Sequence, residues 1–149
     1  MRNTVLNFKE KVKFLGLWFD EKLNWLPHLK DLKARCLKAL NILKCISHRA
    51  WGADRARLLQ FYKAFVRSRL EYGCCVYGSA RPSYLKILDA VHHEGIRLST
   101  GAYRTSPIPS LCAEAGEPPL NIRRHLLMVR QWYRALSGPL SPALNTVAR

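Results

Sequence analysis

The carboxylates of this 149-residue chain decide which chemistry it could carry out. Phosphoryl transfer by two metal ions needs clustered carboxylates that hold divalent ions beside the attacking and leaving oxygens. The chain has four aspartates, each standing singly among basic or apolar neighbours: Asp20, Asp31, Asp54 and Asp89. Its sequence contains no Asp-Asp pair and no glycine-rich phosphate loop. We therefore predict that the chain has no catalytic residues and is not an enzyme.

Cysteine and histidine are the other side chains that could bind a metal or attack a substrate. Cys74 is followed directly by Cys75, His92 is followed by His93, and His125 stands alone. No C-x2-C or H-x3-H spacing supports a zinc site, and neighbouring side chains diverge on a regular helix or strand. We therefore predict no metal ligands. The five cysteines cannot all pair, which favours a reducing location inside the cell, in the nucleus or the cytoplasm.

Basic residues give the chain its strongest chemical character. Lysine and arginine number 25 against 10 aspartates and glutamates, for a net charge of +15. Residues 1–70 hold 16 basic and 5 acidic residues, whereas residues 71–149 hold 9 and 5. Such an excess indicates a polyanionic partner, nucleic acid before an acidic membrane surface. We expect the first half of the chain to make most of that contact.

A β-hairpin is predicted near the start of the chain. Residues 11–19 and 23–25 are two extended runs on either side of a polar turn at residues 20–22. Gly16, inside the first run, suggests a bulge or the close approach of another backbone. Because a lone hairpin is marginally stable, we expect residues 1–25 to be poorly ordered alone, and their apolar side chains to favour self-association or docking against helices.

Helices are predicted over most of the remaining chain, from apolar residues that recur at spacings of three and four. They cover residues 27–47 and 54–70, the segment from Pro82 to near Gly101, and a last segment from residue 120 to Gly138. A short apolar stretch at residues 72–78 and a loop at residues 101–119, with at most a short helix near 110–115, connect them. The predicted fold class is mainly α, a helical bundle preceded by a short β-hairpin.

Four lysines follow the first long helix of this bundle. Lys30, Lys33 and Lys44 fall beside its apolar stripe, and Lys38 lies a little further round. One interpretation is an ordinary solvated face. The other is a helix that lays its lysines along a phosphate backbone.

The order of several short motifs resembles the region that follows the catalytic aspartates in reverse transcriptases of LINE-type (non-LTR, jockey-like) retrotransposons. The first motifs are KFLGLWFD at residues 13–20, LNW at 23–25 and HL at 28–29. Those that resemble the thumb and the region after it are WG at 51–52, EYG at 71–73, IR at 96–97, GA at 101–102, Pro107 and EPPL at 117–120. The resemblance covers about residues 11–136.

The resemblance implies a role in holding nucleic acid. Residues 14–17 would form the primer grip, which supports the terminal sugar and phosphate of the primer, and the helices at 27–47 and 54–70 would flank the template–primer duplex. The nucleic-acid-binding residues that we predict are Lys13, Phe14, Leu15, Gly16, Leu17, Lys30, Lys33, Lys38 and Lys44. The expected partner is an RNA–DNA or RNA duplex, bound with little sequence preference. We expect no binding to a membrane.

The resemblance also divides the chain. Residues 1–26 would hold the primer-grip-like hairpin, 27–100 a thumb-like helical bundle, 101–138 a post-thumb linker and C-terminal helix, and 139–149 a loose tail. In the family, a palm domain with an Asp-Asp motif binds Mg²⁺ upstream of residue 11 and packs against this region. Since that motif is missing here, we predict a truncated C-terminal fragment that grips a duplex without catalysis and needs no cofactor itself.

Two alternatives from other classes stay open. One is a small basic helical module for protein–protein interaction, whose positive face has no nucleic-acid function. The other is a basic amphipathic surface that binds an acidic membrane. Salt separates them, because binding to a nucleic-acid duplex weakens steeply as salt rises, whereas apolar binding to a protein partner does not.

Overall fold

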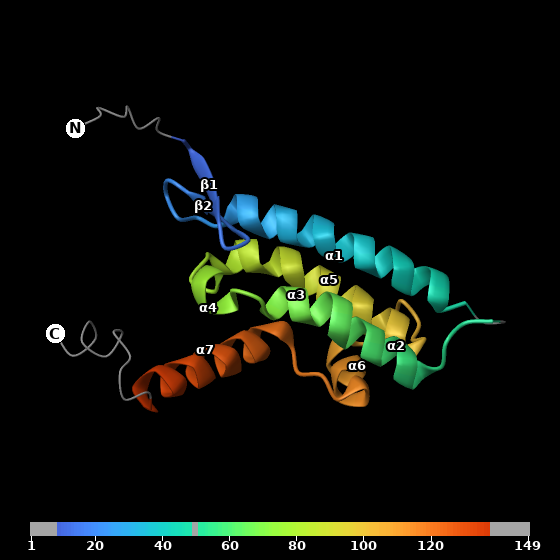
Figure 1. Ribbon diagram of the computed structural model, residues 1–149. Coiled ribbons are helices and arrows are strands. Elements are labelled where there is room, and N and C mark those ends of the chain that lie inside the picture. Colours follow the sequence, from blue (N-terminus) through green and yellow to red (C-terminus); the bar gives the residue numbers. More distant parts are fainter. Residues whose placement is uncertain (1–8, 49–50, 138–149) are drawn as a thin grey trace, which may run out of the picture.

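A computed structural model describes residues 9–48 and 51–137 (Figure 1). Strands β1 (Lys11–Phe14) and β2 (Leu17–Asp20) are followed by helix α1 (Leu26–Ile46). Three consecutive segments then form one continuous helical rod: α2 (Arg55–Phe61), the π-helical segment η1 (Tyr62–Arg67) and α3 (Ser68–Glu71). The later helices are α4 (Cys74–Tyr77), α5 (Pro82–Thr100), α6 (Ile108–Ala115) and α7 (Leu120–Ser137). The predicted mainly α fold with an N-terminal hairpin is confirmed. The predicted tail at residues 139–149 lies outside the described residues.

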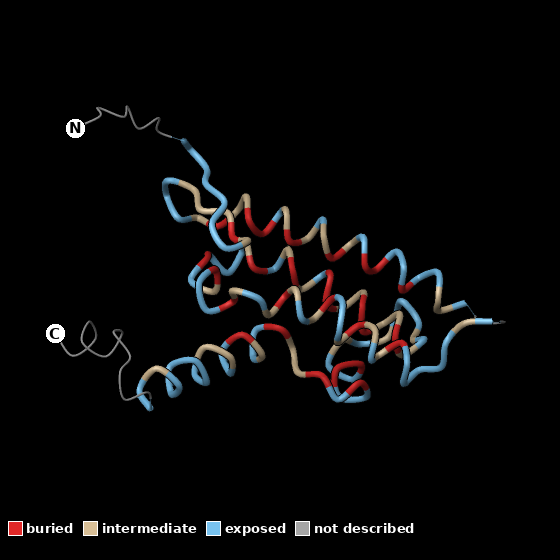
Figure 2. The backbone as a smooth tube through the Cα atoms, in the orientation of Figure 1, coloured by how far each residue is buried: buried red, intermediate tan, exposed pale blue. Residues whose placement is uncertain are grey.

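Helices α1 and α5 and the rod enclose the core (Figure 2). Their inner faces bury mostly leucine and other apolar side chains: Leu29, Leu32, Leu40 and Leu43 from α1, Tyr62, Val66 and Leu70 from the rod, and Leu88, Val91 and Ile96 from α5. Gly95 lets α5 approach the rod closely, since a Cβ there would lie 2.5 Å from the ring of Tyr62. The apolar stripes expected from the sequence therefore meet in one core.

The hairpin forms, but its predicted turn at residues 20–22 is wrong. Phe14 pairs with Leu17 and Lys11 with Asp20, so the turn is Leu15–Gly16. Both residues have positive φ, 47° and 83°, as a two-residue turn that matches the twist of its strands requires. Gly16 is thus a turn residue and not a bulge within a strand.

The carboxylate of Asp20 orders the link between the hairpin and α1. Its oxygens accept the backbone N–H groups of Asn24 and Trp25 at 3.0 and 2.9 Å. The cluster of charged residues after Asp20 is therefore a connection to a helix and not the end of the hairpin.

The helix boundaries follow the sequence signals closely. Pro27 lies in the first turn of α1, α5 begins at Pro82, and α5 ends before Gly101, whose φ of 68° closes the helix. Residues 74–77, predicted only as an apolar stretch, form the short helix α4. Among the helices that the structure describes, none is both long and apolar enough to cross a membrane.

Candidate nucleic-acid interface

Helix α1 carries the predicted lysines along about 21 Å of its length, at a rise of about 1.5 Å per residue. Lys30, Lys38 and Lys44 are exposed and Lys33 is half-buried. Lys44 is neutralised in part, because its Nζ lies 2.6 Å from Oε1 of Glu94 on α5. Within residues 9–48 and 51–137, Lys30, Lys33 and Lys38 have no carboxylate within ion-pair distance. Three of the four lysines are thus not engaged by a described carboxylate and are available to an anion.

The hairpin tip is fixed to the turn between α3 and α4. The Tyr72 hydroxyl donates to the carbonyl of Leu15 at 2.7 Å, and a Cβ on Gly16 would lie 3.5 Å from the Tyr72 ring. Leu17 is only 7% exposed and packs over Gly73, where a Cβ would lie 2.7 Å from the Leu17 side chain. Leu17 is therefore docked on the α3–α4 turn.

The other side chains of the predicted grip remain at the surface. Phe14 and Leu15 are 62% and 72% exposed, and Lys13 is exposed with its Nζ 5.5 Å from the centre of the Trp18 ring. The structure thus separates the predicted grip into an exposed tip and one buried anchor, Leu17.

His28 joins the hairpin to the first turn of α1. The Trp18 backbone N–H makes a long hydrogen bond, 3.4 Å, to Nδ1 of His28. Burial, and then the charge of Arg35, lower the pKa of His28, which keeps the ring neutral and able to accept. Because Lys30 lies only two residues further on, the exposed tip and the lysines of α1 are held on one framework.

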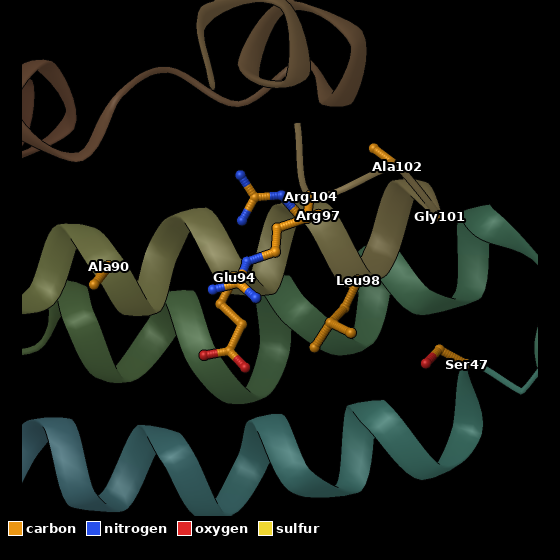
Figure 3. A pocket seen from close by; sticks show the side chains of 8 residues that line it. All are labelled: Ser47, Ala90, Glu94, Arg97, Leu98, Gly101, Ala102 and Arg104. Carbon is orange, nitrogen blue, oxygen red and sulfur yellow. The ribbon is translucent and has the colours of Figure 1, made fainter. Parts of the chain in front are cut away.

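Two arginines that the sequence analysis did not select lie near the far end of α1. A cavity of about 680 Å³ is lined by Ser47, Ala90, Glu94, Arg97, Leu98, Gly101, Ala102 and Arg104 (Figure 3). Guanidinium groups suit phosphate oxygens, so Arg97 and Arg104 are candidate phosphate ligands in a cavity that the Glu94 carboxylate also lines. Arg97 belonged to a motif of the resemblance, but no spacing linked either arginine to α1.

Other basic residues form ion pairs with carboxylates within the protein. The buried carboxylate of Glu117 meets Lys63 at 3.1 Å and Arg67 at 2.7 Å, and Arg123 meets Glu71 at 2.7 Å. Burial alone would raise the pKa of Glu117, but the hydrogen bonds from Arg67 and Lys63 hold it below its usual value. These pairs tie the start of α7 to the rod, so their cations are not free for a phosphate.

The described carboxylates do not fit a magnesium site. Asp20 accepts backbone N–H groups, Asp31 pairs with Arg35 at 3.1 Å, and Asp89 lies 3.6 Å from Arg124. In the part of the chain that the structure describes, no three histidine, cysteine, aspartate or glutamate side chains converge on a point where an ion could sit.

Comparison with known proteins finds two Pol polyproteins from retrotransposable elements and one RNA-directed DNA polymerase from a transposon. The chain is 29% identical over 89 residues to the retrovirus-related Pol polyprotein from type-1 retrotransposable element R1 of Bradysia coprophila. The aligned residues make up 59% of this chain and 9% of that protein. It is 22% identical over 129 residues to the retrovirus-related Pol polyprotein from type-1 retrotransposable element R1 4 of Nasonia vitripennis. That alignment covers 87% of this chain and 33% of the relative. It is 31% identical over 94 residues to the probable RNA-directed DNA polymerase from transposon X-element of Drosophila melanogaster. That alignment covers 60% of this chain and 10% of the relative.

These relatives confirm the resemblance to non-LTR retrotransposon reverse transcriptases. The chain spans between about a tenth and a third of their length. No family model matches the chain. No solved structure matches it either.

Proposed function

We propose that this chain, a relative of non-LTR retrotransposon Pol polyproteins, grips an RNA–DNA or RNA duplex as a thumb-like region and performs no chemistry itself. The observation that carries the proposal is that Lys30, Lys33 and Lys38 of α1 have no carboxylate within ion-pair distance among the described residues. A duplex of A-like form presents sugars and phosphates across a wide, shallow minor groove. Lysines spread along one helix suit such contacts, which position a duplex without reading its sequence.

The hairpin tip is proposed as the primer grip. Phe14 and Leu15 are exposed there and can contact a nucleic-acid strand, and Gly16 forms the turn that holds them at the tip. The hydrogen bond from Tyr72 and the buried Leu17 give this tip a fixed position relative to α1. A grip must hold the end of the primer still, and these two anchors supply that rigidity.

Chemistry is assigned to another part of a longer protein. Under this proposal the region follows the palm, whose aspartates would hold Mg²⁺, and packs against it. The separate structural roles of Asp20, Asp31 and Asp89 support the assignment. We accordingly expect the purified chain to extend no primer with magnesium or manganese.

Salt dependence of duplex binding tests the proposal. We expect weak binding of an RNA–DNA duplex, with Kd about 10⁻⁴ to 10⁻⁶ M at physiological salt. Replacing Lys30, Lys33 and Lys38 together by alanine should lower the slope of log Kd against log salt by about two to three units, since each phosphate contact contributes nearly one. The measurement is fluorescence anisotropy of a labelled duplex over a salt series.

A matched variant separates specific contacts from net charge. Arg57, Arg81 and Lys86 are exposed on or beside α2 and α5, and their joint replacement by alanine removes the same charge. This control should keep the wild-type slope. If both triple variants lost the same amount of slope, binding would depend on net charge alone, and the proposal that α1 contacts the duplex would be overturned. Nucleotide incorporation that survives repurification would overturn the non-catalytic role.

A further inference from the structure

Helix α7 turns its more apolar side away from the body of the molecule. It packs against α4, burying Leu120 and Arg124. Five apolar residues on the opposite side are each 44% to 67% exposed, and we call them the α7 seam: Ile122, Leu126, Val129, Tyr133 and Leu136. Figure 2 shows this helix as exposed over most of its length. A contiguous strip of exposed apolar side chains is typical of an interaction site.

The spacing of the seam is that of a helix pair. Its residues follow one another at four, three, four and three positions, which is the a/d pattern of a heptad repeat. Trp132, which is 49% exposed, borders the seam on the edge away from Arg130 and adds to the apolar surface that a packed helix would cover. The seam therefore fits the side of a second helix.

The charges beside the seam are all positive. Helix α7 contains no aspartate or glutamate between Leu120 and Ser137. Arg130 and Arg134 border the seam on one edge, and both line a groove of about 450 Å³ against the α3–α4 turn. Arg123 on the same edge is already paired with Glu71 at 2.7 Å. A partner with carboxylates along its flank would meet Arg130 and Arg134.

We propose that the α7 seam docks an acidic amphipathic helix, with its apolar residues on the seam and its carboxylates over Arg130 and Arg134. A second copy of this chain fits less well. Antiparallel pairing sets the arginines of one edge against those of the copy, and parallel pairing sets His125 against Arg130, so neither arrangement supplies a carboxylate. This inference is independent of nucleic-acid binding through α1.

Two synthetic peptides test the proposal against the full chain. Both have leucine at the seam-facing heptad positions, and they differ only in carrying glutamate or lysine at the flanking positions. We expect the glutamate peptide to bind, with the lysine peptide at least about fivefold weaker, because each exposed charge pair changes Kd by at most about fivefold and two pairs are reversed. Calorimetric titration gives both Kd values.

Variants locate the binding. Leu126→Ser with Val129→Ser should weaken the glutamate peptide at least about 100-fold, since two apolar contacts are lost. Both side chains are more than half exposed, so the fold is retained, and circular dichroism checks this. Ile42→Ser on α1, where the side chain is 54% exposed, is the matched control and should leave the peptide Kd unchanged. Arg130→Glu with Arg134→Glu should reverse the preference in favour of the lysine peptide.

Three outcomes would overturn the proposal. Equal binding of the two peptides by the wild-type chain would remove the acidic partner. Self-association that Leu126→Ser with Val129→Ser abolishes, without peptide binding, would make the occupant a second copy. Binding to phosphatidylserine vesicles that depends on the same two residues, again without peptide binding, would make it a membrane.

Discussion

A neutral pair of polar side chains lies at the centre of the core. Nδ1 of His92 lies 2.5 Å from the hydroxyl of Tyr62, and both residues are fully buried. Burial, and then the neighbouring His93, lower the pKa of His92 to about 4, while burial raises the pKa of Tyr62. Tyr62 therefore stays protonated and donates, and the neutral His92 ring accepts.

This pair predicts acid sensitivity. In the unfolded chain His92 titrates near 6.5, so between pH 6.5 and about 4 the unfolded state binds the proton and the folded state does not. The contribution of His92 to the free energy of unfolding is complete above pH 6.5. It is lost as the pH falls to about 4, by a total on the order of 3 kcal/mol. His92→Asn keeps an acceptor but does not titrate, so its free energy of unfolding should fall less. Urea denaturation at a series of pH values measures both, and parallel curves would contradict the assignment.

Single residues also show where sequence patterns stop. The helical spacing correctly placed Lys44 with the other lysines of α1. It gave no sign of Glu94, because that carboxylate comes from α5, fifty positions later, and reaches Lys44 only through packing. Arg97 and Arg104 were missed for the same reason, since the cavity they line forms only when α1 and α5 pack together.

Among the elements, the helices were predictable because their signals are local. Prolines at the starts of α1 and α5 and glycine at the end of α5 act within one turn. The hairpin turn was placed wrongly, because three charged residues imitate a turn, whereas the true signal is the single Gly16 at the second turn position. Periodicity also found the apolar residues of α7, but it could not show that they face outward.

The docked hairpin yields a prediction at this scale. A two-stranded hairpin alone is marginal in water, so strands β1 and β2 depend on the buried Leu17. Leu17→Ala should speed amide hydrogen exchange across residues 11–20 while the amides of α5 stay protected. Leu15→Ala, at a side chain that is 72% exposed, should leave exchange unchanged. Equal exchange in the two variants would show that Leu17 does not anchor the hairpin.

Across the whole molecule, free and neutralised charges are separated. Glu71, Glu114 and Glu117 engage basic residues of the rod and the start of α7. The lysines of α1 meet fewer carboxylates among the described residues. Figure 1 shows α1 along one side of the bundle and α7 along the other. The net charge of +15 is therefore most available to a polyanion on the α1 side.

This separation predicts that a duplex and an acidic helix bind at the same time. Helices about 10 Å thick lie between the two surfaces, which exceeds the screening length of about 8 Å at physiological salt. A saturating amount of the glutamate peptide should therefore change the Kd for a labelled RNA–DNA duplex by less than about threefold, since the residual field of the peptide is screened. Anisotropy of the duplex, titrated with and without peptide, measures the change, and sedimentation should show one complex that holds both ligands. The Leu126→Ser, Val129→Ser variant is the control, because it should bind the duplex normally and add no peptide. Complete displacement of the duplex by the peptide would mean that both ligands use one basic surface, and α1 and α7 could not then be independent sites.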